Sequence, residues 1–271
     1  MGKTRWARWG LCALACAVLF LAWLHNPVKN AGEQTPPPAP TVTPQPGPLS
    51  GAVICLDPGH GGYDGGAYGR DSGTPEKALN LDVALRLRDL LRDQGAEVIL
   101  TRETDTALAD EGAERKRRDL KYRVDQAAEA NIFVSVHMNE YRGRSESGPQ
   151  VFYRKGQDAS RLLAGVLQDA MNRDLAPARP RTANTGDYYV LRNLSIPAVL
   201  VECGFLSNAA EEAKLLTPEY RQQVAQAICA GLAEYWQLGR QNGVDCCPIA
   251  PKALKPWAPP FVPPLQMPGF I

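Results

Sequence analysis

Proline is distributed so unevenly along this chain that it limits where a folded core can lie. Seven of the 23 prolines fall in residues 31–50, and eight more fall in residues 248–271. Because proline lacks a backbone N–H and fixes φ, such segments form extended spacers rather than packed helices or sheets. We therefore expect one folded domain over residues 51–240, with a Pro-rich linker over 26–50 before it and a Pro-rich tail over 241–271 after it.

An apolar run precedes the linker. Residues 1–8 carry three basic side chains and no acidic one, and residues 9–24 carry no charge. A helix over the second segment would span about 24 Å, somewhat less than the roughly 30 Å hydrocarbon core of a bilayer. A basic start followed by an apolar run is typical of an export signal. We predict that residues 1–25 are a signal or membrane anchor, and that the folded domain is exported to the outer face of the cytoplasmic membrane or to the cell wall.

The charge balance and the cysteines exclude several classes of protein. Thirty basic residues against 29 acidic ones give a net charge of +1, and no basic face with interleaved aromatic residues is present, so we expect no nucleic-acid partner. Hydrophobic residues make up 44% of the chain, which is enough to build a core. The seven cysteines form no C-x-x-C spacing, and those in the domain fall within apolar patterns, where buried thiols are expected.

Strand and helix patterns alternate within the folded domain. Short apolar runs, typical of strands, occur at residues 52–56, 97–101, 132–136, 151–153, 188–191 and 198–201. Near-continuous apolar strands indicate a sheet that is covered on both faces. Helical patterns occur over residues 160–175, from Thr217 onward, and after Thr74, which we expect to cap a helix with Pro75 in its first position. These patterns predict a three-layer α/β domain with a mostly parallel sheet of about six strands, flanked by helices, which binds its ligand at the carboxyl ends of the strands.

Three of the predicted strands end in residues that are able to take part in chemistry. The segments are DPGHGG at residues 57–62, SVHMN at 135–139 and VECGFLSN at 201–208. The first is a glycine-rich turn, but it lacks the G-K-[ST] ending of a phosphate-binding loop. The third places Glu202 where an apolar strand ends. Such a carboxylate is either a functional group or a buried structural group paired with an arginine.

The folded domain contains two histidines, His60 and His137, since the third, His25, lies beside the apolar run. A single histidine at a strand end is more often structural than a ligand. Two of them, together with Glu76 at the start of a helix, match the three protein ligands of a catalytic zinc site. Because their spacing fits no short metal-binding motif, the residues alone leave the structural and the zinc-binding interpretations open.

The same segments resemble the LytC-type (Amidase_3) N-acetylmuramoyl-L-alanine amidases. The family pattern is D-P-G-H-G-G, a glutamate that opens the next helix, S-[IV]-H-x-N and E-x-G-F-x-S-N, and all four parts occur here in that order. The resemblance implies that one Zn²⁺ per chain is held by His60, Glu76 and His137, and that Glu202 is the catalytic carboxylate. It also implies that the substrate is peptidoglycan, cut at the amide between N-acetylmuramic acid and L-alanine. Glu140 departs from the small residue that usually follows the asparagine, and it would add negative charge near the site.

Within the family the chain is similar to the CwlD (germination-specific) amidases of the spore cortex. It shares with them one N-terminal apolar segment, the stretch RETD at residues 102–105 and a basic insertion at 114–118. This similarity implies a role in germination or in cortex maturation, in which stem peptides are removed before a polysaccharide deacetylase acts to form muramic-δ-lactam. The alternatives are a vegetative autolysin, a zinc exopeptidase and an inactive wall-binding module.

Further polar residues lie close to these motifs. We expect Asp57, Asp64 and Asn139 to orient the metal ligands through hydrogen bonds, although Asp57 could equally fix its turn. Asn80 and Arg123 are expected to be structural.

Overall fold

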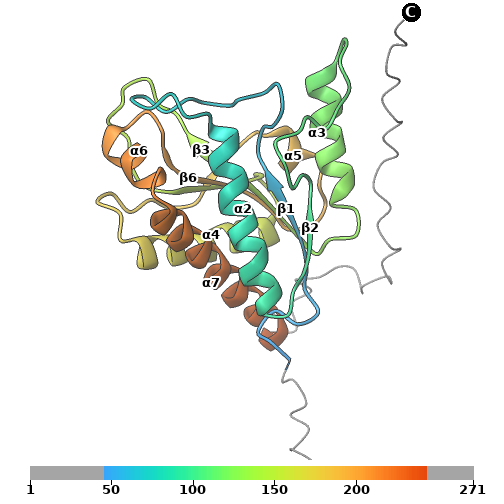
Figure 1. Ribbon diagram of the computed structural model, residues 1–271. Coiled ribbons are helices and arrows are strands. Elements are labelled where there is room, and N and C mark those ends of the chain that lie inside the picture. The colour runs from blue at the N-terminus through green and yellow to red at the C-terminus, as the bar shows by residue number, and fades with distance from the viewer. Residues whose placement is uncertain (1–45, 243–271) are drawn as a thin grey trace, which may run out of the picture. The chain divides into compact units, whose positions relative to one another are not determined.

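The computed structural model describes residues 46–242, and their central feature is a six-stranded sheet in the order β2-β1-β3-β6-β4-β5 (Figure 1). The strands are β1 (Val53–Pro58), β2 (Glu97–Leu100), β3 (Ile132–Asn139), β4 (Gln150–Tyr153), β5 (Asn184–Thr185) and β6 (Ala198–Phe205). The first four in spatial order are parallel, β4 runs antiparallel to β6, and β5 is parallel to β4. The predicted mostly parallel sheet is confirmed.

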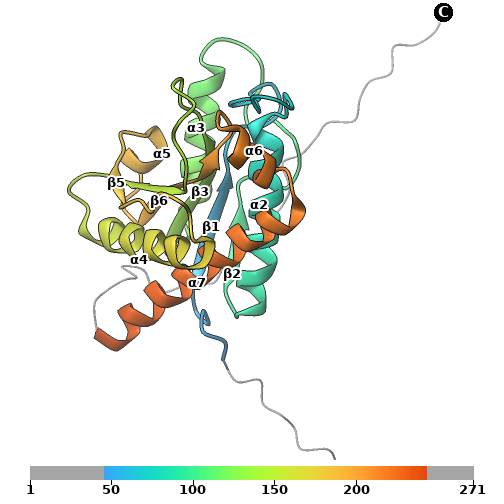
Figure 2. The same ribbon diagram turned by 90° about the vertical axis from the view of Figure 1, so that its left-hand side faces the viewer.

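Helices cover both faces of the sheet, which confirms the three-layer architecture. The helices are α2 (Glu76–Asp93), α3 (Arg115–Gln126), α4 (Asp158–Leu175), α5 (Tyr189–Arg192), α6 (Ala209–Leu215) and α7 (Pro218–Asn242). On one face α2 and α4 both pack against α7, and Figure 2 shows α4 and α7 side by side. The other face carries α3 and α5, which contact each other.

The strand β1 shows why the central strands are apolar at nearly every position. Its residues Ile54 and Leu56 belong to the core cluster under α2, α4 and α7, whereas Val53 and Cys55 belong to the cluster on the opposite face. Successive side chains of a strand point to opposite faces, so a strand that is covered on both sides needs apolar residues throughout. All residues of β1 and β6 are buried.

One predicted strand is wrong. Residues 189–191 belong to the helix α5 and Tyr188 is its N-cap, and the edge of the sheet is formed instead by the short strand Asn184–Thr185. A four-residue apolar run is too short for its periodicity to separate a strand from a helix. Here Val190 and Leu191 pack against the sheet as one helical turn.

The predicted cap of α2 is also wrong. Pro75 occupies the N-cap position itself, and no side chain caps this helix. The hydroxyl of Thr74 accepts a hydrogen bond from the Ser72 hydroxyl 2.9 Å away. Backbone carbonyls take the place of a capping side chain: the Glu76 N–H donates to the Ala67 carbonyl at 2.8 Å, and the Lys77 N–H donates to the Gly65 carbonyl at 3.1 Å.

The folded part begins slightly before residue 51. Leu49 is fully buried, and its N–H donates to the Gln94 carbonyl at the end of α2 at 3.0 Å. The predicted signal or anchor over residues 1–25 lies outside the described residues, as does the tail from residue 243 onward. Within residues 46–242, no helix is long and apolar enough to cross a membrane.

Candidate active site

Three adjacent parallel strands, β1, β3 and β6, end at the same edge of the sheet. His60 lies two residues beyond β1, while His137 and Glu202 are register partners on β3 and β6. The Gly59 N–H donates to the Val136 carbonyl at 2.9 Å, which keeps the first turn against β3 after the strand has ended. The topology therefore brings the three predicted motifs to one place, as ligand sites in such sheets require.

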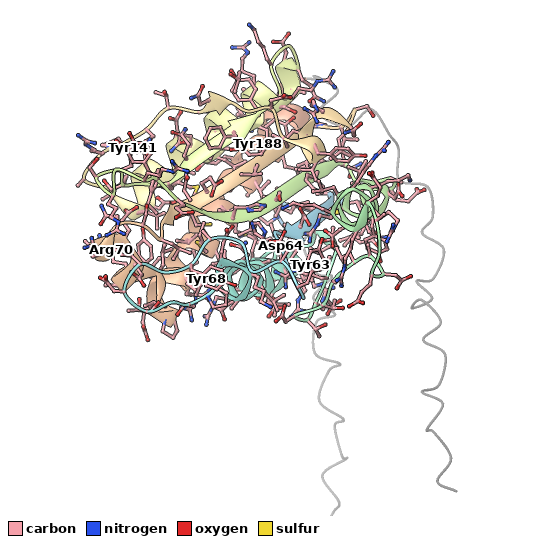
Figure 3. All side chains as sticks on the ribbon, turned by 90° about the horizontal axis from the view of Figure 1, so that it is seen from above. Tyr63, Asp64, Tyr68, Arg70, Tyr141 and Tyr188 are labelled. Carbon is pink, nitrogen blue, oxygen red and sulfur yellow. The ribbon has the colours of Figure 1, made fainter. Side chains whose placement is uncertain are left out.

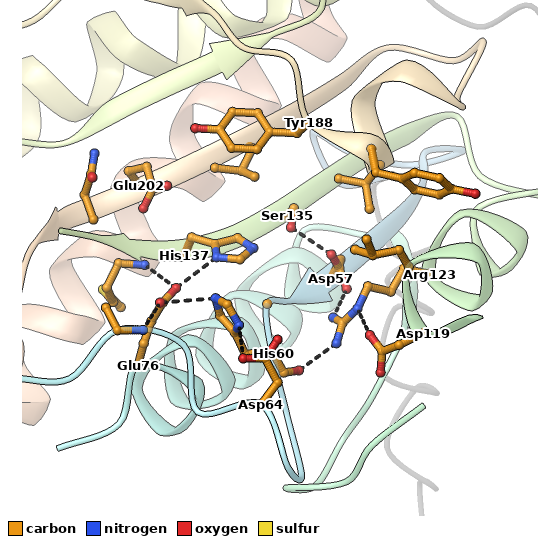
Figure 4. Close-up of a pocket in the computed structure, with 18 of the residues that line it drawn as sticks. Asp57, His60, Asp64, Glu76, Asp119, Arg123, Ser135, His137, Tyr188 and Glu202 are labelled. Atoms are coloured by element: carbon orange, nitrogen blue, oxygen red, sulfur yellow. Dashed lines mark hydrogen bonds and ion pairs between the residues drawn. The ribbon is translucent and has the colours of Figure 1, made fainter. Parts of the chain in front are cut away.

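His60, Glu76 and His137 form a compact group at this edge (Figure 4). His60 Nε2 lies 3.2 Å from one carboxylate oxygen of Glu76, and His137 Nδ1 lies 2.9 Å from the other. One ligand atom from each residue can be chosen so that all lie within 4.8 Å of one another. The structure thus brings together the three residues that the family resemblance implies as zinc ligands.

The Glu76 carboxylate is held firmly in this group. It is buried, and it accepts hydrogen bonds from the backbone N–H groups of Ala67 (2.8 Å) and Met138 (3.1 Å) and from the Asn80 side chain (3.0 Å). Burial alone would raise the pKa of Glu76, but the contacts with His137 and His60 outweigh it and hold the pKa well below its usual range. Glu76 is therefore anionic at neutral pH, as a metal-binding carboxylate must be.

Glycines make room for the histidine rings. A Cβ atom on Gly59 would lie 2.2 Å from Cε1 of His137, and a Cβ on Gly66 would lie 2.4 Å from the Glu76 carboxylate. Gly66 also has a φ of +69°, which favours glycine. The glycine-rich turn that the sequence showed is thus a close-packed wall of the site.

Asp64 is the partner of His60. One of its carboxylate oxygens lies 3.0 Å from His60 Nδ1, and the other lies 3.2 Å from the ammonium group of Lys116. A partner on Nδ1 fixes the orientation of the ring and leaves Nε2 to face Glu76. This is the orienting contact that we expected of Asp64.

Asp57 lies in a separate buried network. Its carboxylate accepts hydrogen bonds from Thr101 (2.7 Å), Ser135 (2.7 Å) and Arg123 (2.6 Å). Burial works to raise the pKa of Asp57, yet Arg123 and the hydroxyl donors hold it below its ordinary value. Arg123 also donates to the His60 carbonyl at 2.7 Å. Asp57 therefore fixes the turn through Arg123, which is the second of the two roles considered for it.

Glu202 is the register partner of His137, and the surroundings of its carboxylate differ from those of the Glu76 carboxylate. Its side chain is 8% exposed, and its Oε2 atom has no hydrogen-bond partner. It forms no ion pair with an arginine of residues 46–242, so the structural interpretation of this carboxylate has no support. Burial raises the pKa of Glu202 to about 7, against the opposing influence of His137.

These groups line a pocket of about 480 Å³ that extends over the sheet toward α5. Glu140 and Asn139 line it at the end of β3. Figure 4 shows Tyr188 on the side of the pocket opposite Glu76 and Asp64. Three exposed tyrosines surround the same strand ends: Figure 3 shows Tyr63 and Tyr68 on one side and Tyr141 on the other.

Comparison with known proteins decides which family this site belongs to. The profile of the N-acetylmuramoyl-L-alanine amidase family, Amidase_3, matches residues 54–234, which include the whole site. The chain belongs to this family. This confirms the predicted enzyme class: the protein is an N-acetylmuramoyl-L-alanine amidase that acts on peptidoglycan.

The chain is similar to two curated amidases and to one solved amidase structure. The germination-specific N-acetylmuramoyl-L-alanine amidase of Bacillus subtilis (strain 168) is 41% identical over 195 residues, which cover 70% of this chain and 81% of that protein. LytC of the same organism is 35% identical over 194 residues, but these are 36% of its length. Among solved structures, the CwlD amidase from Clostridioides difficile, in complex with the GerS lipoprotein, has a TM-score of 0.67 and 36% identity, covering 69% of this chain and 99% of that one.

Asn80, which we expected to be structural, was not connected by sequence reasoning with the proposed metal ligands of this amidase. Its side chain donates both to Glu76 and to the Gly59 carbonyl, and so it joins the helix to the glycine-rich turn. Asn80 lies four residues after Glu76, a spacing that puts two side chains on one face of a helix. That spacing was a usable signal.

Proposed function

We propose that this amidase binds one Zn²⁺ through His60, Glu76 and His137. The donor set supports the proposal, because two imidazoles and one carboxylate with an open position are typical of catalytic zinc sites. The close packing of Gly59 and Gly66 supports it as well, since it holds the rings and the carboxylate in one group. When bound, zinc polarises the scissile carbonyl and lowers the pKa of a water molecule.

We infer that Glu202 carries the proton during hydrolysis. The observation that supports this most directly is its buried Oε2 atom, which lacks a partner while the Glu76 oxygens have several. A pKa of about 7 suits a group that accepts a proton from the attacking water and then delivers it to the departing amine of L-alanine. The proposed site thus contains one carboxylate that stays anionic and one that changes its protonation state.

We propose a role in spore cortex maturation or germination. The similarity to a germination-specific amidase and to CwlD supports it. In this role the enzyme would remove stem peptides before a polysaccharide deacetylase acts, and muramic-δ-lactam would result. The domain would then act outside the cytoplasmic membrane, tethered by residues 9–24, and protease added to intact protoplasts would remove it.

The bond that is cut can be identified directly. Purified peptidoglycan is incubated with the zinc-loaded enzyme and the products are analysed by mass spectrometry. The proposal predicts free stem peptides that begin with L-alanine and glycan strands that have lost them. New amino groups inside the peptide, with muramic acid still substituted, would instead indicate a peptidase. Cortex from spores that lack the gene should contain little muramic-δ-lactam, and a normal content would contradict the cortex role.

A further inference from the structure

The catalytic pocket has no basic side chain that is free to bind the carboxylate end of a peptide. Seven carboxylates and two basic side chains line it, and both basic side chains already have acidic partners. Lys116 pairs with Asp64, and Arg123 pairs with Asp57 and Asp119. A linear stem peptide ends in a free carboxylate, and no basic side chain of this pocket is free to pair with it. That end of the substrate therefore needs to leave the pocket toward positive charge.

A second pocket, of about 610 Å³, adjoins the first through Asp187, which lines both. We call it the basic pocket: it is lined by Arg154, Lys155, Thr185, Gly186, Asp187, Arg192 and Asn193. Asp187 is the one acidic residue of its wall, and it pairs with Arg192 at 2.9 Å. Two cationic groups remain without an acidic partner in the wall.

Those two groups are Arg154 and Lys155, both exposed. Arg154 donates to the Arg192 carbonyl at 3.1 Å, which places its guanidinium beside α5. Among residues 46–242, the ammonium group of Lys155 has no acidic partner. The basic pocket thus offers free hydrogen-bond donors to an anion. Arginine and lysine side chains both bind carboxylates well.

The position of Arg154 fits the length of a stem peptide. Gln150 on β4 is the register partner of Glu202, and Arg154 follows it by four residues. Four residues of a strand span about 13 Å, which is also about the reach of an extended peptide of four residues. Arg154 follows the last residue of β4, two positions after Phe152. The ring centroids of Phe152 and Tyr188 lie 5.6 Å apart. Since Tyr188 lines the catalytic pocket, the path between the pockets follows one face of the sheet.

We propose that the basic pocket binds the carboxylate end of the stem peptide through Arg154 and Lys155. This rests on the proposed function, because it takes the scissile amide to lie beside Glu202. It gives the substrate a direction across the site: the peptide runs past Tyr188 toward α5, and the glycan lies toward the opposite rim, where Tyr63 and Tyr68 are exposed.

Two substrates that differ only at the peptide end test this proposal. One is an N-acetylmuramoyl tetrapeptide with a free C-terminal carboxylate, and the other is the same molecule with a C-terminal amide. The zinc-loaded wild-type enzyme should have a kcat/KM about 3- to 20-fold higher for the carboxylate, as expected of one or two partly exposed charge pairs. The preference should appear mainly in KM and should decrease as salt is added.

The double variant Arg154→Gln/Lys155→Gln should lose this preference while cleaving the amidated substrate as the wild type does. Cleavage of the amidated substrate thereby shows that the variant is folded. The single variant Lys155→Gln, at a side chain without an acidic partner, should lose part of the preference. Arg161→Gln is the matched control, because Arg161 on α4 is 66% exposed and pairs with Asp158 outside both pockets.

The outcomes separate the two proposals. A double variant that keeps the full preference, or a wild type that has none, would overturn the role of the basic pocket while leaving the amidase reaction intact. Cleavage of neither substrate at the N-acetylmuramoyl amide would contradict the proposed function itself, and the inference that rests on it.

Discussion

His137 and Glu202 are register partners on the neighbouring parallel strands β3 and β6. The pairing places a proposed metal ligand and the proposed proton carrier at the same level of the sheet, each near the end of a buried strand. Because side chains alternate along a strand, a shift of one residue in either strand would turn one of the two away from the pocket. The reaction that we propose therefore depends on strand register as much as on residue type.

The space beside the histidine ring gives the first prediction. Gly59→Ala should weaken zinc binding and lower turnover, because the added Cβ would lie 2.2 Å from the His137 ring and force it to move. Gly165→Ala in α4 is the control: its Cβ meets nothing within 4 Å, and alanine stabilises a helix interior by about 1 kcal/mol over glycine. Zinc titration and turnover should be compared for both. Normal zinc affinity in Gly59→Ala would show that the ring is not fixed by this contact.

The buried ion pair of Arg123 and Asp57 gives the second. Arg123→Met should lower the free energy of unfolding by about 3–5 kcal/mol, because it leaves a buried carboxylate without its cation. It should also loosen the turn that holds His60, since Arg123 donates to that backbone carbonyl. Arg117→Met, at a side chain that is 76% exposed, should change stability by less than about 0.5 kcal/mol. Urea unfolding measures the free energy of unfolding of both variants. An equal decrease in the two would show that the buried pair contributes no more than an exposed one.

The sequence was informative about this fold where a residue pattern has one structural meaning. The apolar runs of β1, β3 and β6 indicated a covered parallel sheet, because a strand buried on both faces has no polar positions to spare. The run at residues 188–191 had no such single meaning: its last three residues form part of the helix α5, where Val190 and Leu191 are buried.

The site was predictable in composition but not in geometry. The four motifs identified His60, Glu76, His137 and Glu202 as the residues to examine, through a family resemblance rather than through spacing. Asp57 pairs with Arg123 and not with a histidine, and these two residues are 66 positions apart in the sequence. No local pattern contains such a contact, and it follows only from the way in which α3 packs.

The start of the folded domain gives the third prediction. A fragment of residues 46–242 should unfold cooperatively and bind zinc without the Pro-rich segments. A fragment that begins at Gly51 loses Leu49, a fully buried side chain, and should be less stable by about 2 kcal/mol. Urea unfolding of the two fragments measures the difference. Equal stability would mean that Leu49 contributes nothing to the core.

The fourth prediction concerns pH. The pKa of Glu202 rises to about 7 through burial. Between the ordinary pKa of a glutamate and pH 7, the unfolded chain has released this proton and the folded protein has not, so the group lowers stability as the pH rises across that window. Glutamine does not titrate. In metal-free protein, the stability of Glu202→Gln relative to wild type should therefore increase by about 2–3 kcal/mol from about pH 4.5 to about pH 7.5. A difference that does not change with pH would contradict the raised pKa.

The division of roles between the metal ligands and Glu202 is the central claim, and zinc content and amide cleavage measured on the same samples test it most directly. Glu202→Gln should retain close to one zinc per chain while turnover falls by about 10²–10⁴-fold, the usual contribution of a positioned general base. His60→Ala and His137→Ala should lose zinc and activity together, and Glu97→Gln, on the exposed end of β2, should lose neither. A Glu202→Gln protein that has lost its zinc would make Glu202 a ligand, and one that remains fully active would show that another residue, with Glu140 the first to test, carries the proton.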